Sequence, residues 1–282
     1  MSQEQAKTIL EQWRESALYW EKHSHIVRTM FAPITRAMIE AAGINAGQSV
    51  LDVAGGVGEP SITIAEIAGD SGSVIFTDAV NEMVSAAKRY AQQRTLANIE
   101  FCQCLANSLP FRNNSFDVVV CRLGVMLFSE PRAAMQEMLR VLKSKGRLSL
   151  AVWGPSKANP FFHVVSDIVS RYVESQPEDP DAPGAFRFAE RGKLARALAE
   201  AGASDVAERI LDFNIEAPLT PKQFWQVRSE LSDTLRGKLA TLSSAQLDCL
   251  AEEVEEAGRA FFAEGQMRFP AQMLIVTGLR RS

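Results

Sequence analysis

The chain has 282 residues, a length that accommodates one large α/β domain with additional helices. Hydrophobic residues make up 46% and charged residues 23% of the sequence, a balance that excludes the disordered and fibrous classes. The formal net charge is -4, and the lysines and arginines are scattered along the chain, which argues against a nucleic-acid partner.

The sequence carries no signal for a membrane span or for export. No apolar run reaches the roughly 18 residues that a bilayer requires, and residues 1–13 lack the pattern of a signal peptide, so we predict a cytoplasmic protein. Cys102, Cys104, Cys121 and Cys249 lack zinc spacing, and we expect reduced thiols and no metal site. Cys102 and Cys104 would face one side of a strand, which leaves soft-metal binding as a minor alternative.

Apolar residues recur at helical spacing through residues 1–45, which predicts an N-terminal helical lid. From 46 to 154 the pattern changes to short apolar strands that alternate with helices, the arrangement of a parallel sheet covered on both faces. The expected strands are 49–53, 73–77, 98–102, 116–121 and 146–153, and the expected helices are 60–69, 81–94 and 131–143.

Residues 155–282 complete the sheet and add a helical cap. We expect helices at 160–175 and 189–201, a loop at 176–184, and strands at 206–215 and 271–280. A helical insert at about 220–265 separates these strands, and Thr220 with Gln223 and Ser243 with Gln246 have capping-box spacing. The predicted fold is therefore α/β and Rossmann-like, with a seven-stranded, mostly parallel sheet.

The strongest chemical signal is the stretch VLDVAGGVGEP at 50–60. It reads as a strand that carries Asp52 and turns through glycines into a helix that begins near Pro60. Glycines permit a positive φ and a close approach of ligand to backbone, and the helix that follows offers free N–H groups. Such a turn suits an adenosine-containing ligand that carries a carboxylate.

Asp78 ends the next predicted strand, 20 residues after Gly58, where an acid is expected to bind ribose hydroxyls. The alternative is that Asp78 only caps the following helix. In the dinucleotide pattern G-x-G-x-x-G counted from Gly56, the third glycine falls on Ser61, so that pattern fails. Asp52 would repel a pyrophosphate and suits an ammonium group, such as that of S-adenosylmethionine (SAM).

Residues 49–153 resemble the class I SAM-dependent methyltransferases, specifically the branch of the ubiquinone and menaquinone C-methyltransferases. The similar stretches are VLDVAGGVGEP, VIFTDAVNEMVSAAKR and LPFRNNSFDVVVCRLGVMLFSEPRAAMQEMLRVLKSKGRLSLAVW. The resemblance implies SAM as cofactor, S-adenosylhomocysteine as product, and a set of cofactor-binding residues. These are Asp52, Ala54, Gly56 and Gly58 at the methionine part, Asp78 and Ala79 at the ribose, Met83, Ala106 and Asn107 at the adenine, and Cys121 and Leu123 beside the sulfonium.

Two positions depart from the pattern of that branch. Ala54 replaces the first glycine of D-x-G-x-G-x-G, and we expect a negative φ there because alanine tolerates a positive φ poorly. Leu105 stands where the branch often has an aspartate that accepts a hydrogen bond from the adenine amine. We therefore expect adenine binding through backbone groups, Asn107 and apolar contacts.

Methyl transfer from a sulfonium requires an acceptor held in line at about 3 Å and no covalent enzyme residue. His23, His25 and His163 are the first candidates for a base, and a satisfied or exposed histidine is the alternative for each. Arg122 is a candidate for binding an acidic acceptor, or else forms a salt bridge in the lid. Aromatic residues available for an acceptor pocket are Tyr19, Trp20, Phe31, Trp153, Phe161 and Phe162.

The sequence thus predicts a SAM-dependent methyltransferase that acts on O or C of a small, aromatic or apolar molecule, with a homodimer as a possible assembly. Two alternatives stay open. One is a SAM-binding protein without methyl transfer, and the other is an NAD-dependent oxidoreductase, against which the broken glycine pattern argues.

Overall fold

The computed structural model of the chain describes residues 3–174 and 179–281, and for 3–8 the backbone alone. The last residue of the predicted helix 160–175 and the first part of the predicted loop 176–184 lie outside these ranges. None of the helices within the described ranges is long and apolar enough to cross a membrane.

The sheet has the strand order β3-β2-β1-β4-β5-β8-β6. The first five strands of this order pair in parallel, and β8 runs antiparallel to both of its neighbours. The predicted mostly parallel, Rossmann-like sheet is therefore confirmed. The strands are β1 Ser49–Val53, β2 Ser73–Asp78, β3 Ile99–Gln103, β4 Phe116–Arg122, β5 Leu142–Trp153, β6 Ala203–Ala217 and β8 Gln266–Arg280, with a short extra strand, β7 Phe262–Ala263, paired to β8.

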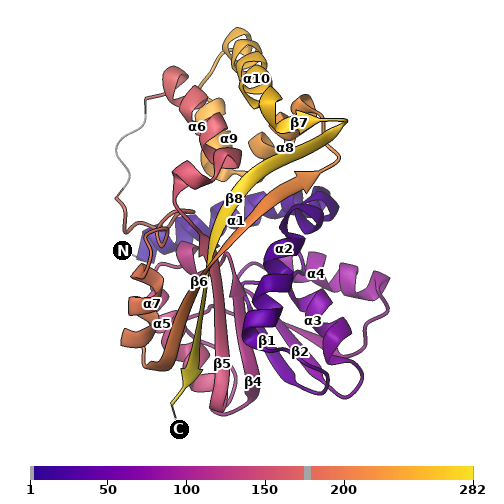
Figure 1. Ribbon diagram of the computed structural model, residues 1–282, viewed down its shortest axis with the longest axis vertical. Coiled ribbons are helices and arrows are strands. Elements are labelled where there is room, and N and C mark those ends of the chain that lie inside the picture. The colour runs from indigo at the N-terminus through magenta and orange to yellow at the C-terminus, as the bar shows by residue number, and fades with distance from the viewer. Residues whose placement is uncertain (1–2, 175–178, 282) are drawn as a thin grey trace.

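Helices cover both faces of the sheet, with α2, α3 and α4 on one face and α5 and α7 on the other (Figure 1). The buried β1 and β4 accordingly read as nearly continuous apolar runs. The helices are α1 Gln3–Lys22, α2 Ser24–Ala42, α3 Ser61–Ala68, α4 Asn81–Gln93, α5 Pro131–Val141, α6 Pro160–Tyr172, α7 Lys193–Glu200, α8 Pro221–Leu231, α9 Asp233–Leu239 and α10 Ser244–Gly258, and the 3-10 turns are η1 Val125–Leu127, η2 Ser156–Ala158 and η3 Arg259–Phe261.

The predicted helix 131–143 is shorter than expected. Leu142 already pairs with Phe116 of β4, so α5 ends at Val141 and β5 begins at Leu142. Cross-strand pairing at Leu142 thus takes the chain out of the helix earlier than the apolar spacing indicates.

The segment between β6 and β8 forms the predicted helical insert, and both predicted capping boxes, at Thr220 and Ser243, are formed. The long β6 and β8 form a ribbon that extends beyond the sheet and carries α8, α9 and α10 (Figure 1). Helix α1 lies between this insert and the sheet, where it contacts α4 on one side and α8 and α9 on the other. The N-terminal helix is therefore enclosed between two parts of the chain that are distant in sequence.

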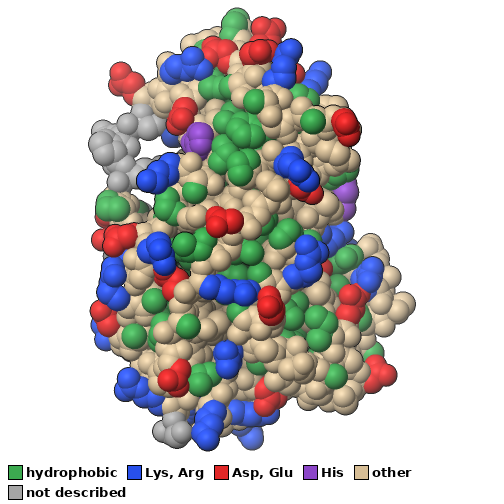
Figure 2. All heavy atoms as spheres, in the orientation of Figure 1, with side chains coloured by type: hydrophobic (Ala, Val, Ile, Leu, Met, Phe, Trp, Pro, Cys, Tyr) green, Lys and Arg blue, Asp and Glu red, His purple; other side chains and the backbone are tan. Residues whose placement is uncertain are grey.

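The surface carries mixed charge. On the face drawn in Figure 2, basic and acidic side chains are interspersed, and hydrophobic side chains reach the surface between them. Leu18 of α1 is 70% exposed. This face therefore presents no extended field of one sign that would steer a highly charged partner.

Candidate functional site

A cavity of about 480 Å³ opens at the carboxyl ends of the parallel strands. The strand order reverses between β1 and β4, and ligands of open α/β sheets bind in the crevice at such a switch point. The volume lies in the range of small-ligand sites. One wall comes from strand ends and loops, and includes Ala54, Gly55, Gly56, Glu59, Asp78, Ala79, Met83, Leu105, Ala106, Asn107, Arg122 and Leu123, while the other comes from α1 and α2 and consists of Ile9, Leu10, Trp13, Trp20, Val27 and Phe31.

The glycine turn after β1 is shaped by close packing below and open space above. A Cβ at Gly55 would lie 2.4 Å from the Phe76 ring and 2.7 Å from the Asp52 carboxylate, so only glycine fits. Gly56 has a φ of +58°, and a Cβ there would meet no protein atom within 4 Å. Because Gly56 lines the cavity, that free space is available to a ligand.

The expectation of a negative φ at Ala54 is wrong, since its φ is 59°. A left-handed conformation costs a non-glycine residue roughly 1–2 kcal/mol. The Ala54 methyl group occupies space that Gly124 leaves free, because a Cβ on Gly124 would lie only 2.7 Å from it. Tertiary packing against Gly124 therefore holds Ala54 in a strained conformation at the cavity wall.

Asp78 braces the glycine turn. Its Oδ2 accepts a hydrogen bond from the Gly56 N–H at 3.0 Å, and its Oδ1 accepts one from the Val80 N–H at 2.9 Å. Burial raises the pKa of Asp78 to about 6, although these backbone donors act in the opposite direction. The alternative role as a helix cap is not formed, because the N-cap of α4 is Val80 and no side chain caps it, whereas the Asp78 carboxylate lines the cavity.

Asp52 lies beneath the turn rather than in the cavity wall. Its side chain is fully buried, and Ser61 donates its hydroxyl to Oδ2 at 2.6 Å. Burial raises the pKa of Asp52 to about 7, against the lowering effects of Ser61 and Arg122, and Oδ1 has no hydrogen-bond partner within the described part of the chain. Glu59, for which no role was predicted from the sequence, is the carboxylate of this turn that lines the cavity. The sequence signal for this role is that Glu59 directly follows Gly58, the last glycine of the turn.

Of the predicted cofactor residues, Asp52, Gly58 and Cys121 do not line the cavity. Gly58 packs toward α4, where a Cβ would lie 3.5 Å from the Ala87 Cα. Cys121 is fully buried, and burial raises the pKa of its thiol. The other predicted residues that the structure brings together at the wall are Ala54, Gly56, Asp78, Ala79, Met83, Ala106, Asn107 and Leu123.

The expected adenine end of the cavity is apolar with one amide. Met83 is buried, and Leu105 lines the cavity with 48% of its surface exposed. The Asn107 Nδ2 donates to Glu130 Oε2 at 2.7 Å. Part of the hydrogen-bonding capacity of Asn107 is therefore already used by Glu130.

The three histidines do not line the cavity. The His23 Nε2 lies 2.6 Å from Glu230 Oε2, His25 is exposed, and the His163 Nδ1 lies 3.6 Å from Asp167. The structure thus leaves the three histidines outside this cavity, because the start of α2 and helix α6 direct them elsewhere. Arg122 alone of the four catalytic candidates lines the cavity.

The aromatic residues proposed for an acceptor pocket divide into two groups. Trp20 and Phe31 line the cavity, and Trp153 packs behind Phe31 with the ring centroids 5.6 Å apart. Phe161 and Phe162 continue this cluster into the core, and Tyr19 lies under the Arg236 guanidinium. The apolar wall is therefore supplied by the N-terminal helices.

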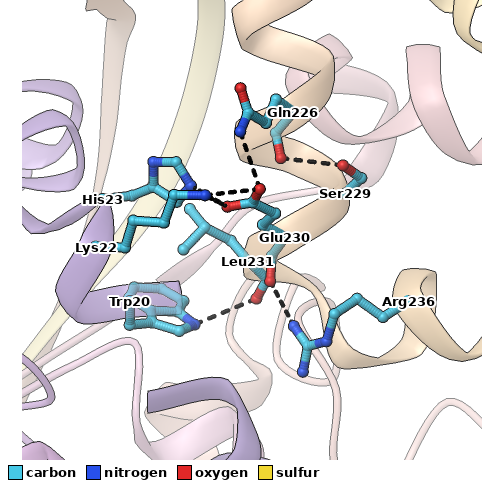
Figure 3. A network of polar contacts seen from close by, with 8 residues as sticks. All are labelled: Trp20, Lys22, His23, Gln226, Ser229, Glu230, Leu231 and Arg236. Atoms are coloured by element: carbon cyan, nitrogen blue, oxygen red, sulfur yellow. Dashed lines mark hydrogen bonds and ion pairs between the residues drawn. The ribbon is translucent and has the colours of Figure 1, made fainter. Parts of the chain in front are cut away.

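A group of polar contacts, which we call the α1 latch, fastens that wall to the insert (Figure 3). It consists of Trp20, Lys22 and His23 on one side and Glu230, Leu231 and Arg236 on the other. The Trp20 Nε1 donates to the Leu231 carbonyl at 3.2 Å, and the Lys22 Nζ lies 2.7 Å from Glu230 Oε2. Burial alone would raise the pKa of Glu230, but hydrogen bonds from Lys22, Gln226 and His23 outweigh it and hold this pKa at about 2.

Residues 30–166 match the model of the ubiE/COQ5 methyltransferase family. The ubiquinone/menaquinone biosynthesis C-methyltransferase UbiE of Cellvibrio japonicus is 40% identical over 114 residues, which make up 40% of this chain and 46% of that protein. The chain thus spans about half the length of the curated relatives that it matches. The resemblance predicted from residues 49–153 is confirmed.

Solved structures share the fold. YcgJ from Bacillus subtilis aligns with a TM-score of 0.56 at 22% identity, over 88% of this chain and 98% of that one. The [4+2]-cyclase SpnF aligns with a TM-score of 0.54 at 18% identity, over 95% and 97% of the two chains. The chain therefore shares its fold with these two proteins. Residues 30–166 are similar to the ubiE/COQ5 methyltransferase family.

The burial of Asp52 predicts a pH dependence of stability. Its pKa rises from 3.8 in the unfolded chain to about 7 in the folded protein, so its contribution to stability is complete below about pH 4 and is lost as the pH rises through 7. We expect Asp52→Asn to increase the free energy of unfolding of the ligand-free protein by roughly 1–3 kcal/mol at pH 8 and to change it little at pH 4. Urea unfolding at both pH values measures this.

The exposed Asp70→Asn serves as the control, with no expected pH-dependent gain. Equal effects of Asp52→Asn at pH 4 and pH 8 would show that Asp52 is not held at a raised pKa.

Proposed function

We propose that the protein binds SAM in this cavity and transfers its methyl group to O or C of a small, aromatic or apolar molecule. The observation that carries the proposal is the two-sided cavity, which has Asp78 and the glycine turn at one wall and Trp20 and Phe31 at the other. The similarity of residues 30–166 to the ubiE/COQ5 family supports it.

The cofactor is proposed to lie along the strand ends, with its ribose diol on the Asp78 carboxylate and its methionine part over residues 54–58. The free space above Gly56 supports this arrangement, because the backbone there is open to a ligand. Met83, Ala106 and Asn107 are proposed to contact the adenine. The cofactor ammonium is proposed to lie nearer to Glu59 than to Asp52, since Asp52 is fully buried and Glu59 lines the cavity.

SAM supplies the methyl group on a sulfonium, so the chain has to orient the acceptor and exclude water. The apolar wall from α1 and α2 suits a flat or apolar acceptor, because its aromatic rings gain contact area without requiring hydrogen bonds. If an acceptor requires removal of a proton, Glu130 can accept it, because its carboxylate lines the cavity outside the apolar wall and the proposed arrangement does not assign it to the cofactor.

We propose the domain organisation that the sequence indicated, with residues 1–45 as a lid, 46–154 as the SAM-binding core, and 155–282 as further strands with a cap at about 220–265. The α1 latch supports a joint action of lid and cap, since Trp20 both lines the cavity and donates to Leu231. A homodimer and a cytoplasmic location stay predictions from the sequence.

A SAM-binding protein without methyl transfer is the second candidate. Two observations support this second candidate. Leu105 lines the cavity at a position where the ubiquinone and menaquinone C-methyltransferases often have an aspartate. SpnF, whose structure is similar, is a [4+2]-cyclase. An NAD-dependent oxidoreductase is the third. A thermal-shift comparison separates it from the first two, because a ligand that binds the folded state raises the melting temperature.

We predict that Asp78→Asn weakens the binding of S-adenosylhomocysteine by roughly 10- to 100-fold, because the amide replaces a charged acceptor of ribose hydroxyls. Calorimetric titration measures the dissociation constant. Asp70→Asn, an exposed aspartate outside the cavity, should bind as the unchanged protein does. A wild-type protein that is stabilised by NAD and not by SAM would contradict the proposed function.

We predict that Glu230→Gln loosens the α1 latch. Glu230 is 21% exposed at its side chain and contacts both Lys22 and His23, so the loss of its charge should speed amide hydrogen exchange in residues 13–22 by about 3- to 10-fold. The matched control is Glu216→Gln, which removes an ion pair with Arg268 of equal length, 2.7 Å, outside the latch. Exchange that is unchanged in Glu230→Gln, or equally faster in both variants, would count against the latch.

A further inference from the structure

Arg122 is a partly buried cation that forms no ion pair with the described residues, although the carboxylates of Asp52 and Glu59 are close enough to act on its charge. It ends β4 and reaches across the turn, where its Nη1 donates to Thr35 Oγ1 at 2.9 Å and its Nη2 donates to the Glu59 carbonyl at 2.9 Å. Both acceptors are neutral. Its Nε is buried and donates to no atom of the described residues, which also provide no carboxylate oxygen within 4.0 Å of this guanidinium. A partly desolvated guanidinium with an unpartnered N–H is stabilised by a ligand that supplies an anionic acceptor.

The charges of the cavity wall have a clear asymmetry. The wall includes the carboxylates of Glu59, Asp78 and Glu130, and Arg122 is its one cationic side chain among the described residues. SAM carries two positive centres, the sulfonium and the ammonium, and one negative group, the carboxylate. An acidic wall with a single guanidinium matches that distribution of charge.

We propose that the Arg122 guanidinium binds the carboxylate of the methionine part of the cofactor, an inference that rests on the proposed function. The hydrogen bond to the Glu59 carbonyl holds the guanidinium at the end of the glycine turn, directly before α3. That end of the turn is where the methionine part lies in the proposed arrangement. A guanidinium matches a carboxylate because its planar fork offers several N–H donors at once.

An acidic acceptor is the other source of a carboxylate for Arg122. The acceptor wall of Trp20, Val27 and Phe31 is apolar, whereas the contacts of Arg122 lead to Glu59 and to Thr35 of α2. The position of Arg122 therefore matches the proposed place of the cofactor carboxylate better than that of an acceptor carboxylate. The two carboxylates can be distinguished by binding measurements. If Arg122 binds the cofactor carboxylate, the affinity for S-adenosylhomocysteine depends on Arg122, and if it binds an acidic acceptor, that affinity does not.

The test compares S-adenosylhomocysteine with 5′-methylthioadenosine, which keeps the adenosine and the thioether but lacks the amino-acid part. We expect Arg122→Gln to weaken S-adenosylhomocysteine binding by roughly 10- to 100-fold and 5′-methylthioadenosine binding by less than about 2-fold. Arg122→Lys, which keeps the charge without the fork, should lose less affinity than Arg122→Gln. Calorimetry on the full chain gives each dissociation constant.

Arg209→Gln is the matched control, since Arg209 also reaches α2, where it donates to the Ala37 carbonyl, and does not line the cavity. It should leave both affinities unchanged. Equal binding of S-adenosylhomocysteine by wild type and Arg122→Gln overturns the inference. So does a result in which each Arg122 variant loses as much affinity for 5′-methylthioadenosine as for S-adenosylhomocysteine. Failure of the wild type to bind either ligand contradicts the proposed function instead.

Discussion

The hydrogen bond from the Gly56 N–H to the Asp78 carboxylate is the contact on which the site depends. It joins the turn after β1 to the end of β2, two strands that pair in parallel and therefore end at the same edge of the sheet. The packing of Gly55 against Phe76 and Asp52 fixes the turn from below. The backbone above Gly56 is left open as a result, and the cavity forms there.

The same arrangement places charge where folding alone would not favour it. Asp52 and Asp78 both have raised pKa values because burial desolvates their carboxylates, and Arg122 is half-buried and forms no ion pair with the described residues. Ala54 adds a strained φ. These unfavourable features gather at one end of β1, β2 and β4, in the manner of a site that gives up stability for ligand binding. The proposed positive centres and carboxylate of the cofactor would compensate them.

Local patterns predicted the sheet well, because β1, β2 and β4 are apolar runs and the glycine turn follows directly from the first of them. Features set by distant partners were not predictable in this way. The φ of Ala54 depends on Gly124, the end of α5 depends on pairing between Leu142 and Phe116, and His23 is turned to Glu230. The sequence indicated which residues can bind a ligand or transfer a proton, and tertiary packing decided which of them reach the cavity.

The most direct measurement is a crystal structure of the full chain grown with S-adenosylhomocysteine. We expect electron density with the ribose hydroxyls on Asp78, the adenine against Met83, and the carboxylate within hydrogen-bonding distance of Arg122. Density for the nucleoside at another part of the surface, or a cavity occupied by a nicotinamide cofactor from the expression host, would contradict the proposed function.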